Sequence, residues 1–260
     1  MEQLTKFVVY TVITGNYDDV KELTFKRNEN IKYICFTNNK NVKSNTWDVI
    51  FINEDLNDHM LNRKIKLFPH KYIENCDFSL YVDGNILIKN DLICFFEKYC
   101  NNELIMALPR HMDRECIYKE AEVCIFQKKD DPDKISAQMS RYRAEGFPND
   151  FGLYENNIIL RNHSSSMMYR IMISWWSELN NESKRDQLSL CYALWRMKVK
   201  IITLEESSRS KNPYFSIVLH KSYQEFGILR RFIVLVDMNK HKNLFYKSIN
   251  IAFSFLRKLK

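Results

Sequence analysis

The segment Phe78-Ser-Leu-Tyr-Val-Asp83-Gly84-Asn85 contains the strongest structural signal in this sequence. Residues 78–82, four of them apolar or aromatic, predict a buried strand that runs directly into an acid, a glycine and an amide. Asp83 and Asn85 would present two oxygen ligands at the rim of a sheet, which suits Mg²⁺ or Mn²⁺, and Gly84 would let a diphosphate approach the backbone. A lone Asp-Gly-Asn also forms ordinary β-turns, so both a turn and a metal site remain open.

Short β-rich runs alternate with helix-length stretches on both sides of this segment. Strands that are separated by helices need crossover connections, which predicts an α/β fold with a mainly parallel sheet covered on both faces. The predicted strands are 7–13, 31–37, 48–52, 78–82, 104–108, 157–160 and 199–202. The predicted helices are 58–72, 91–99, 115–127, 132–145, 166–180 and 184–197.

Polar residues follow the first two predicted strands, at the edge where sheets of this kind bind ligands. Tyr17 and Asp18 come after a turn at Gly15 and offer a stacking ring and a hydrogen-bond acceptor. Thr37 and Asn38 come directly after the second strand. An ordinary turn and an ordinary strand exit are the alternatives to a binding role.

Three basic residues, Arg63, Lys66 and His70, share one face of the predicted helix 58–72 because they are spaced i, i+3 and i+7. Such a stripe is usually a solvated surface. A pyrophosphate, however, would need this combination of forked and point-charge donors.

Two later stretches contain further candidates. His111, Arg114 and Glu120 lie in a dense polar stretch in which a structural hydrogen-bond network is the alternative. Asp186 stands near the start of the predicted helix 184–197, where an acid also serves as a simple cap. Glu178 follows a Trp-Trp pair that is expected in the core, and its own side chain could face a site.

The composition is that of a soluble globular protein: 260 residues, 45% hydrophobic and 27% charged, with only 5 Gly and 5 Pro. The longest uninterrupted aliphatic or aromatic run, 232–236, is far shorter than the roughly 20 residues of a membrane-spanning helix. The 7 cysteines fit neither a disulfide framework nor a metal knuckle, and the N-terminus carries an acid, Glu2, where a signal peptide needs bases. We therefore expect reduced thiols and a cytoplasmic protein.

The net charge of +7 is concentrated at one end of the chain. Between Gln224 and Lys260, eight bases face two acids, a net of +6 that leaves +1 for the rest. The nearly neutral body argues against a nucleic-acid partner. Residues 244–260 have the pattern of a basic amphipathic helix, which suits an anionic membrane surface, its own domain or a second subunit.

Eight motifs within residues 7–195 follow one another in a recognisable order. They are Tyr10-Thr-Val-Ile-Thr-Gly-Asn-Tyr-Asp18, Ile34-Cys-Phe-Thr37, Arg63-Lys-Ile-Lys66-Leu-Phe-Pro-His70, Tyr81-Val-Asp83-Gly84-Asn85, His111-Met-Asp-Arg114-Glu-Cys116-Ile-Tyr118-Lys-Glu120-Ala, Gln138 through Tyr142 to Gly146-Phe-Pro148, Gly152-Leu-Tyr-Glu155 and Arg185-Asp-Gln187-Leu-Ser. With these motifs the chain resembles a family of GT-A-like glycosyltransferases, first described as a domain of unknown function. The family occurs in bacterial surface-polysaccharide loci and in plant Golgi proteins of the mucilage-related and turgor-regulation-defect group.

The resemblance implies a Rossmann-like GT-A domain over residues 1–223, followed by a basic helical extension over 224–260. It implies a nucleoside-diphosphate sugar as donor, with UDP favoured over GDP and GDP as the alternative, and a divalent cation, Mn²⁺ or Mg²⁺. The metal ligands would be Asp83, Asn85 and His220, a histidine late in the chain. The implied donor-binding residues are Thr11, Tyr17, Asp18, Thr37, Asn38, Arg63, Lys66, His70, Asp83, Gly84, His111 and Arg114.

The implied reaction is sugar transfer to a glycan, free or lipid-linked, in the synthesis of capsule or lipopolysaccharide. Asp186 and Gln187 are similar to the Asp-Gln element of glycogenin-like transferases, where the acid binds sugar hydroxyls and the amide lies beside the anomeric carbon. Asp186 would orient the donor sugar or act as general base, and Glu120 and Glu178 are rival bases. A lipid-linked acceptor would place the enzyme at the inner face of the cytoplasmic membrane. A non-catalytic module that binds nucleotide sugars or glycans is the alternative.

Overall fold

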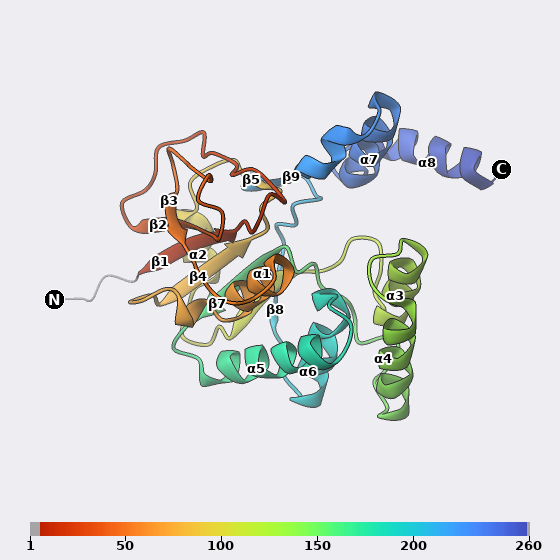
Figure 1. Cartoon of the computed structure of the whole chain (residues 1–260), viewed down its shortest axis with the longest axis horizontal. Coiled ribbons are helices and arrows are strands. Elements are labelled where there is room, and N and C mark those ends of the chain that lie inside the picture. Colours follow the sequence, from red (N-terminus) through yellow and green to blue (C-terminus); the bar gives the residue numbers. More distant parts are fainter. Residues whose placement is uncertain (1–5, 259–260) are drawn as a thin grey trace.

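The computed structural model describes residues 6–258, with side chains as far as residue 253. Its elements are shown in Figure 1. In chain order they are β1 (Phe7–Val12), β2 (Ile31–Thr37), β3 (Asp48–Phe51), α1 (Asp58–Leu67), the 3₁₀ helix η1 (Pro69–Lys71), β4 (Phe78–Val82), β5 (Ile86–Ile88), α2 (Ile93–Tyr99), β6 (Met106–Pro109), α3 (Ile117–Phe126), α4 (Pro132–Ala144), β7 (Ile158–Asn162), α5 (Ser166–Asn181), the 3₁₀ helix η2 (Asp186–Leu188), α6 (Leu190–Arg196), β8 (Ile202–Leu204), β9 (Phe215–Ile217), the 3₁₀ helix η3 (Lys221–Glu225), α7 (Ile228–Asn239) and α8 (Leu244–Lys258).

Seven strands form one sheet in the order β3-β2-β1-β4-β7-β6-β8. Only β7 of these seven described strands is antiparallel to its neighbours, and the others run in one direction. The register pairs Val82 with Ile158, so the carboxyl end of β4 and the amino end of β7 share one edge. The predicted α/β architecture with a mainly parallel sheet is confirmed.

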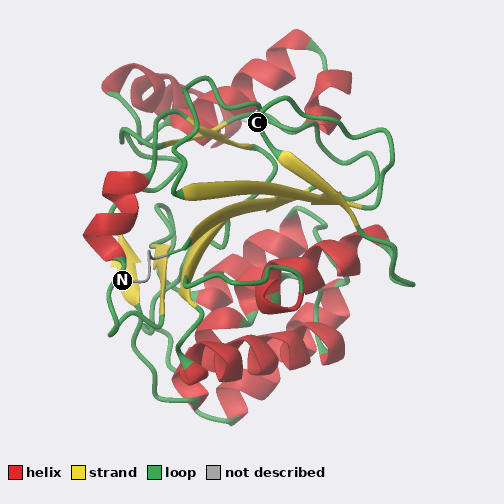
Figure 2. Ribbon diagram, turned by 90° about the vertical axis from the view of Figure 1, so that its left-hand side faces the viewer, coloured by secondary structure: helices red, strands yellow, loops and turns green. Residues whose placement is uncertain are grey.

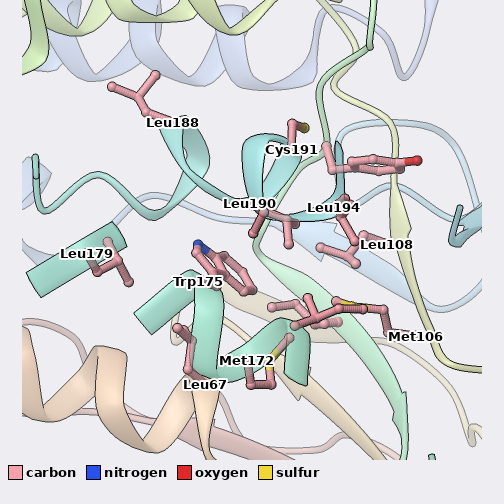
Figure 3. Packing of buried hydrophobic residues seen from close by; sticks show 14 of the residues in the cluster. Leu67, Met106, Leu108, Met172, Trp175, Leu179, Leu188, Leu190, Cys191 and Leu194 are labelled. Atoms are coloured by element: carbon pink, nitrogen blue, oxygen red, sulfur yellow. The ribbon is translucent and has the colours of Figure 1, made fainter. Parts of the chain in front are cut away.

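The central strands separate two apolar layers, as their alternating side chains require. Tyr10 and Tyr81 pack into the larger layer, which α1 and α3 to α6 cover, whereas Val9 and Leu80 pack toward α2. Figure 2 shows the strands between a larger group of helices below and further elements above. In Figure 3, Trp175 of α5 lies at the centre of the larger layer.

Two predicted helices are each divided in the structure. Asn57 caps α1 by accepting a hydrogen bond from the Met60 N–H (2.9 Å), but Pro69 ends the regular helix and begins η1. The predicted helix 184–197 becomes η2 followed by α6. There the Asp186 carbonyl accepts from Trp175 Nε1 (2.9 Å) and from the Ser189 N–H in a 3₁₀ turn (3.4 Å), and the regular helix begins only at Leu190.

The prediction of a strand over 199–202 was wrong in position, because β8 spans Ile202–Leu204. Lys198, with a φ of 54°, turns the chain after α6, and pairing with β6 begins only at Ile202. The two-stranded sheet β5-β9 was missed, since strands of three residues are too short to show a period.

The α7 and α8 helices lie at the upper right of Figure 1, beyond the small sheet. Met238 of α7 packs in the same apolar cluster as Leu80. No helix among residues 6–258 is long and apolar enough to cross a bilayer. All seven cysteines are free, and the division of the chain at residue 223 stays a prediction.

Candidate functional site

Charged side chains from separate elements meet at the carboxyl-end edge of β1 and β4. Asp83 follows β4, and Asp18 lies in the loop after β1. Lys66 comes from the last turn of α1, Asp186 from η2, and His220 immediately precedes η3. This is the edge at which the sequence predicted ligand binding.

Lys66 is the centre of this group, although only 1% of the residue is exposed. Its Nζ lies 2.8 Å from Asp186 Oδ2, 3.4 Å from Asp83 Oδ1 and 4.8 Å from the centroid of the Tyr81 ring. The Tyr81 hydroxyl donates to the same Oδ1 of Asp83 at 2.7 Å. A buried ammonium needs such partners, because its desolvation would otherwise be costly.

Asp186 stays ionised despite its burial. Burial alone would raise its pKa, but Arg63, Lys66 and Arg185 outweigh this effect and hold the pKa well below its usual range. Arg63 Nε is 3.6 Å from Asp186 Oδ2. A carboxylate with such a low pKa is a poor general base, since an efficient base has a pKa near the working pH. The low pKa of Asp186 therefore argues against a role as general base.

Arg185 and Tyr81 belong to this group, and sequence reasoning missed both as site residues. Arg185 Nε is buried without a hydrogen-bond partner among the described residues, and Arg185 contributes to the low pKa of its neighbour Asp186. A base directly before the candidate acid was the available signal for Arg185. For Tyr81 the signal was the two-residue spacing from Asp83, which places both on one side of an extended chain.

Asp18 and His220 form a second pair beside Asp83. Asp18 Oδ2 is 2.6 Å from His220 Nδ1, and Asp18 Oδ1 accepts from the Lys221 N–H at 2.9 Å. Gly84 lies against Asp18, because a Cβ there would be 3.5 Å from the Asp18 Cβ. The Tyr17 ring, largely exposed, lies 5.2 Å from the His220 ring.

Asn85 is close to the same pair through the small sheet. Its Nδ2 donates to the Val218 carbonyl at 3.1 Å, and its own carbonyl accepts from the Val218 N–H at 2.9 Å. No group of three or more His, Cys, Asp or Glu side chains within residues 6–258 is arranged to hold a metal ion. A cation here would therefore depend on the Asn85 amide and on ligands from the substrate.

The residues predicted for the nucleoside pocket are mostly engaged within the protein. Thr11 is 4% exposed, and its Oγ1 has no partner among the described residues. Thr37 Oγ1 accepts from the Asn39 N–H at 3.0 Å. Asn38 accepts from the Gly15 N–H (2.8 Å) and donates to Asp58 Oδ1 (2.7 Å), so it braces the turn after β1.

His70 does not join the charged group, although it follows Lys66 in sequence. Its ring packs edge-on against Tyr169 of α5 at 4.6 Å, and burial is the main cause that lowers its pKa. The break at Pro69 takes His70 off the face that Arg63 and Lys66 share. The prediction that one helix face presents all three bases was therefore wrong.

His111, Arg114 and Glu120 form a network of their own. Arg114 Nε donates to Glu120 Oε2, and Glu120 is 1% exposed. His111 Nδ1 accepts from the Arg114 N–H at 3.0 Å. Arg185 connects this network to the charged group, because its positive charge favours the ionised forms of both Asp186 and Cys124. The Cys124 thiol in turn donates to Glu120 Oε1 at 3.5 Å.

Gln187 and Glu178 end in different surroundings. Gln187 Nε2 donates to the Tyr154 carbonyl at 3.1 Å, which ties η2 to the segment before β7. Glu178 is paired with Arg141 Nη2 and accepts from the Tyr142 hydroxyl at 2.7 Å, both from α4. These contacts tie Glu178 to the α4–α5 interface, apart from the charged group.

Acidification should destabilise the fold through His111 and His163. Burial, aided by Arg114 and Arg161 respectively, lowers the pKa of each to about 4. The unfolded chain binds these protons near pH 6.5, so stability is lost as the pH falls below that value. Between pH 7 and 5 we expect a loss of about 1–2 kcal/mol per histidine, measured by urea unfolding. The double variant His111→Gln/His163→Gln should show a shallower pH dependence, and an unchanged slope would contradict this account.

The TOD1/MUCI70 glycosyltransferase-like domain family matches residues 1–213. The chain belongs to this family. A relative, the probable hexosyltransferase MUCI70 of Arabidopsis thaliana, is 25% identical over 217 residues, which cover 73% of this chain and 37% of that protein. The match thus spans little more than a third of the relative's length. The solved structure of the glycosyltransferase GlyE from Streptococcus pneumoniae TIGR4 has a TM-score of 0.44 and 14% identity, covering 77% of this chain and 45% of GlyE.

Membership of the TOD1/MUCI70 family confirms the resemblance seen in the sequence motifs. The match includes Asp83, Lys66 and Asp186, and it ends before His220 and the two C-terminal helices. The charged group at the edge of the sheet therefore lies mainly within the glycosyltransferase-like domain.

Proposed function

We propose that the charged group binds a nucleoside-diphosphate sugar and that the chain transfers the sugar, a hexose, to a glycan acceptor. The supporting observation is the convergence of Arg63, Lys66 and Arg185 with Asp83 and Asp186 at the carboxyl-end edge of the sheet. Family membership supports a glycosyltransferase, and this edge is where an α/β sheet binds nucleotides. UDP as the nucleotide and a bacterial surface polysaccharide as the acceptor are further parts of the proposal.

The residues present fit a divalent cation. His220 Nδ1 is held by Asp18, an arrangement in which a carboxylate orients a metal-ligating histidine and leaves Nε2 for the metal. Asp83 Oδ2 has no hydrogen-bond partner among residues 6–258, and the Asn85 nitrogen is taken by Val218, which leaves its Oδ1. Asp83, Asn85 and His220 would hold the ion together with phosphate oxygens of the donor. Such an ion would offset negative charge on the departing nucleoside diphosphate.

Side chains of the protein itself would bind the diphosphate, the sugar and the base of the donor. Arg63 offers guanidinium N–H groups to the diphosphate, and its charge stabilises the leaving group. Asp186 faces both Arg63 and Lys66, so a donor that draws Arg63 toward its phosphates would leave the carboxylate to accept from sugar hydroxyls. The exposed ring of Tyr17 provides a stacking surface near the same edge.

A thermal-shift panel of UDP, GDP and CMP, each with Mn²⁺ or with chelator, tests this proposal. A ligand at about 100 times its Kd adds about 2.7 kcal/mol, a shift of several degrees for a chain of this size. We expect one diphosphate to stabilise the protein only with metal. Asp83→Ala should abolish the shift, whereas Asp48→Ala, which removes an exposed acid of β3 paired with Arg27, should retain it. If no nucleotide raises the melting temperature, or if Asp83→Ala leaves the shift intact, the donor site is not here.

A further inference from the structure

The outer surface of the two C-terminal helices exposes large apolar side chains. Ile228 (86%) and Leu229 (69%) lie in the first turn of α7. Leu244 (79%), Phe245 (65%) and Ile251 (60%) lie on α8. In Figure 1 these helices stand at one corner of the molecule, away from the main sheet.

The apolar row formed by Leu244 and Ile251 on α8 faces away from α7. Phe253 contacts Phe232 of α7 with ring centroids 6.3 Å apart, which defines the inner side of α8. Leu244 and Ile251 are seven residues apart and share a side, and Leu244 lies nearly half a turn from Phe253 around the axis. The row is therefore not used by packing between the two helices.

Basic residues border this apolar row. Lys247 lies one turn after Leu244 on the exposed part of α8, and Arg230 and Arg231 are exposed beside Ile228 and Leu229. The segment 224–260 carries a net charge of +6, almost all of the +7 of the chain.

We propose that the outer face of α7 and α8 lies in the surface of an anionic lipid membrane. Apolar and aromatic side chains flanked by bases are the chemistry that recognises such a surface, since the apolar groups insert and the bases pair with anionic headgroups. A second copy of the chain fits less well. A symmetric dimer through this face would bring the exposed bases Arg230, Arg231 and Lys247 of two copies together.

The connection between the two helices fixes this face relative to the body. Lys240 Nζ is 3.0 Å from Asp113 Oδ2, and His241 Nε2 is 2.7 Å from Asp113 Oδ1. Lys242 Nζ donates to Ser216 Oγ of β9 at 2.7 Å. These contacts fix the membrane-facing helices relative to the body, so the protein lies on the membrane in one orientation. The loop that carries His111 and Arg114 is fixed in the same way, because Asp113 belongs to it.

Sedimentation of the full chain with lipid vesicles tests the proposal without any nucleotide, so its result is independent of the proposed activity. Vesicles of phosphatidylglycerol and phosphatidylcholine should bind at least about tenfold more protein than vesicles of phosphatidylcholine alone, and about 1 M salt should weaken the binding. The variant Leu244→Gln/Phe245→Gln/Ile251→Gln should lose binding by about tenfold or more. The control Phe126→Gln/Ile173→Gln changes two exposed apolar residues outside the segment 224–260 and should bind as the wild type does.

Three results would overturn the proposal. The first is equal binding to neutral and anionic vesicles, and the second is equal loss in the triple variant and the control. The third is a dimer, seen by analytical ultracentrifugation without lipid, that the triple variant dissociates while vesicle binding is absent. In that case the face is an interface between copies of the chain.

Discussion

Replacing Lys66 with methionine should lower the free energy of unfolding by about 3–5 kcal/mol, the usual cost of removing one partner from a buried ion pair. Methionine keeps most of the side-chain volume, so packing changes little. Asp186 loses its closest cation at 2.8 Å and is left as a buried carboxylate with Arg63 at 3.6 Å. Urea unfolding of the nucleotide-free protein measures the effect.

Lys64→Met is the matched control, because Lys64 lies on the same helix and is also paired with an acid. Its partner Glu54 lies at the protein surface, and both side chains are over a quarter exposed. Such a pair contributes at most about 1 kcal/mol. Adding Asp186→Asn to Lys66→Met should recover part of the lost stability, since it removes the uncompensated charge. Equal effects of Lys66→Met and Lys64→Met would show that the buried pair does not stabilise the fold as described.

Replacing Asp186 with asparagine should reduce sugar transfer by about 10²–10⁴-fold, the range over which a positioned polar group contributes to catalysis. Asparagine has the shape of aspartate but lacks the charge that Arg63, Lys66 and Arg185 preserve in the wild type. The residual rate should keep the pH dependence of the wild type, because a carboxylate with so low a pKa does not titrate in the working range. Initial rates at saturating donor, measured across pH, test both statements.

Glu206→Gln is the control for this experiment. Glu206 is a buried acid (7% exposed) paired with Lys98 at 2.9 Å and with the Tyr99 hydroxyl at 2.6 Å, on the α2 side of the sheet. Its replacement should alter stability rather than the transfer rate. The role assigned to Asp186 fails if Asp186→Asn retains the rate while Glu178→Gln or Glu120→Gln abolishes it, since those acids were the rival bases.

Local signals were sufficient to predict the main sheet and the edge at which the candidate site lies. The apolar run before Asp83 is a buried strand, as its composition requires, and the alternation of strands and helices is realised in a mainly parallel sheet. Parallel strands end at a common edge, so the position of Asp83, Asp18 and Thr37 near that edge followed from the order of elements alone.

The pairing within the site was not predictable from sequence. Lys66 and Asp186 are 120 residues apart, and their contact depends on the place where η2 meets the end of α1. His70 was predicted to join the site and does not. Helical spacing places residues on one face only while the helix continues, and Pro69 interrupts this helix before His70. Similarly, no periodicity could reveal that Arg141 and Tyr142 engage Glu178 within the α4–α5 interface.

Release of free nucleoside diphosphate from UDP- and GDP-sugars by the wild-type protein is the most direct test of the central claim. Mn²⁺, or Mg²⁺ in its place, should support release from one nucleotide class, and chelator should stop it. The rate should rise when a glycan acceptor is added. Saturable binding of a nucleotide sugar with no release under any of these conditions would contradict transfer and leave a binding module. Absence of both binding and release would contradict the donor site itself.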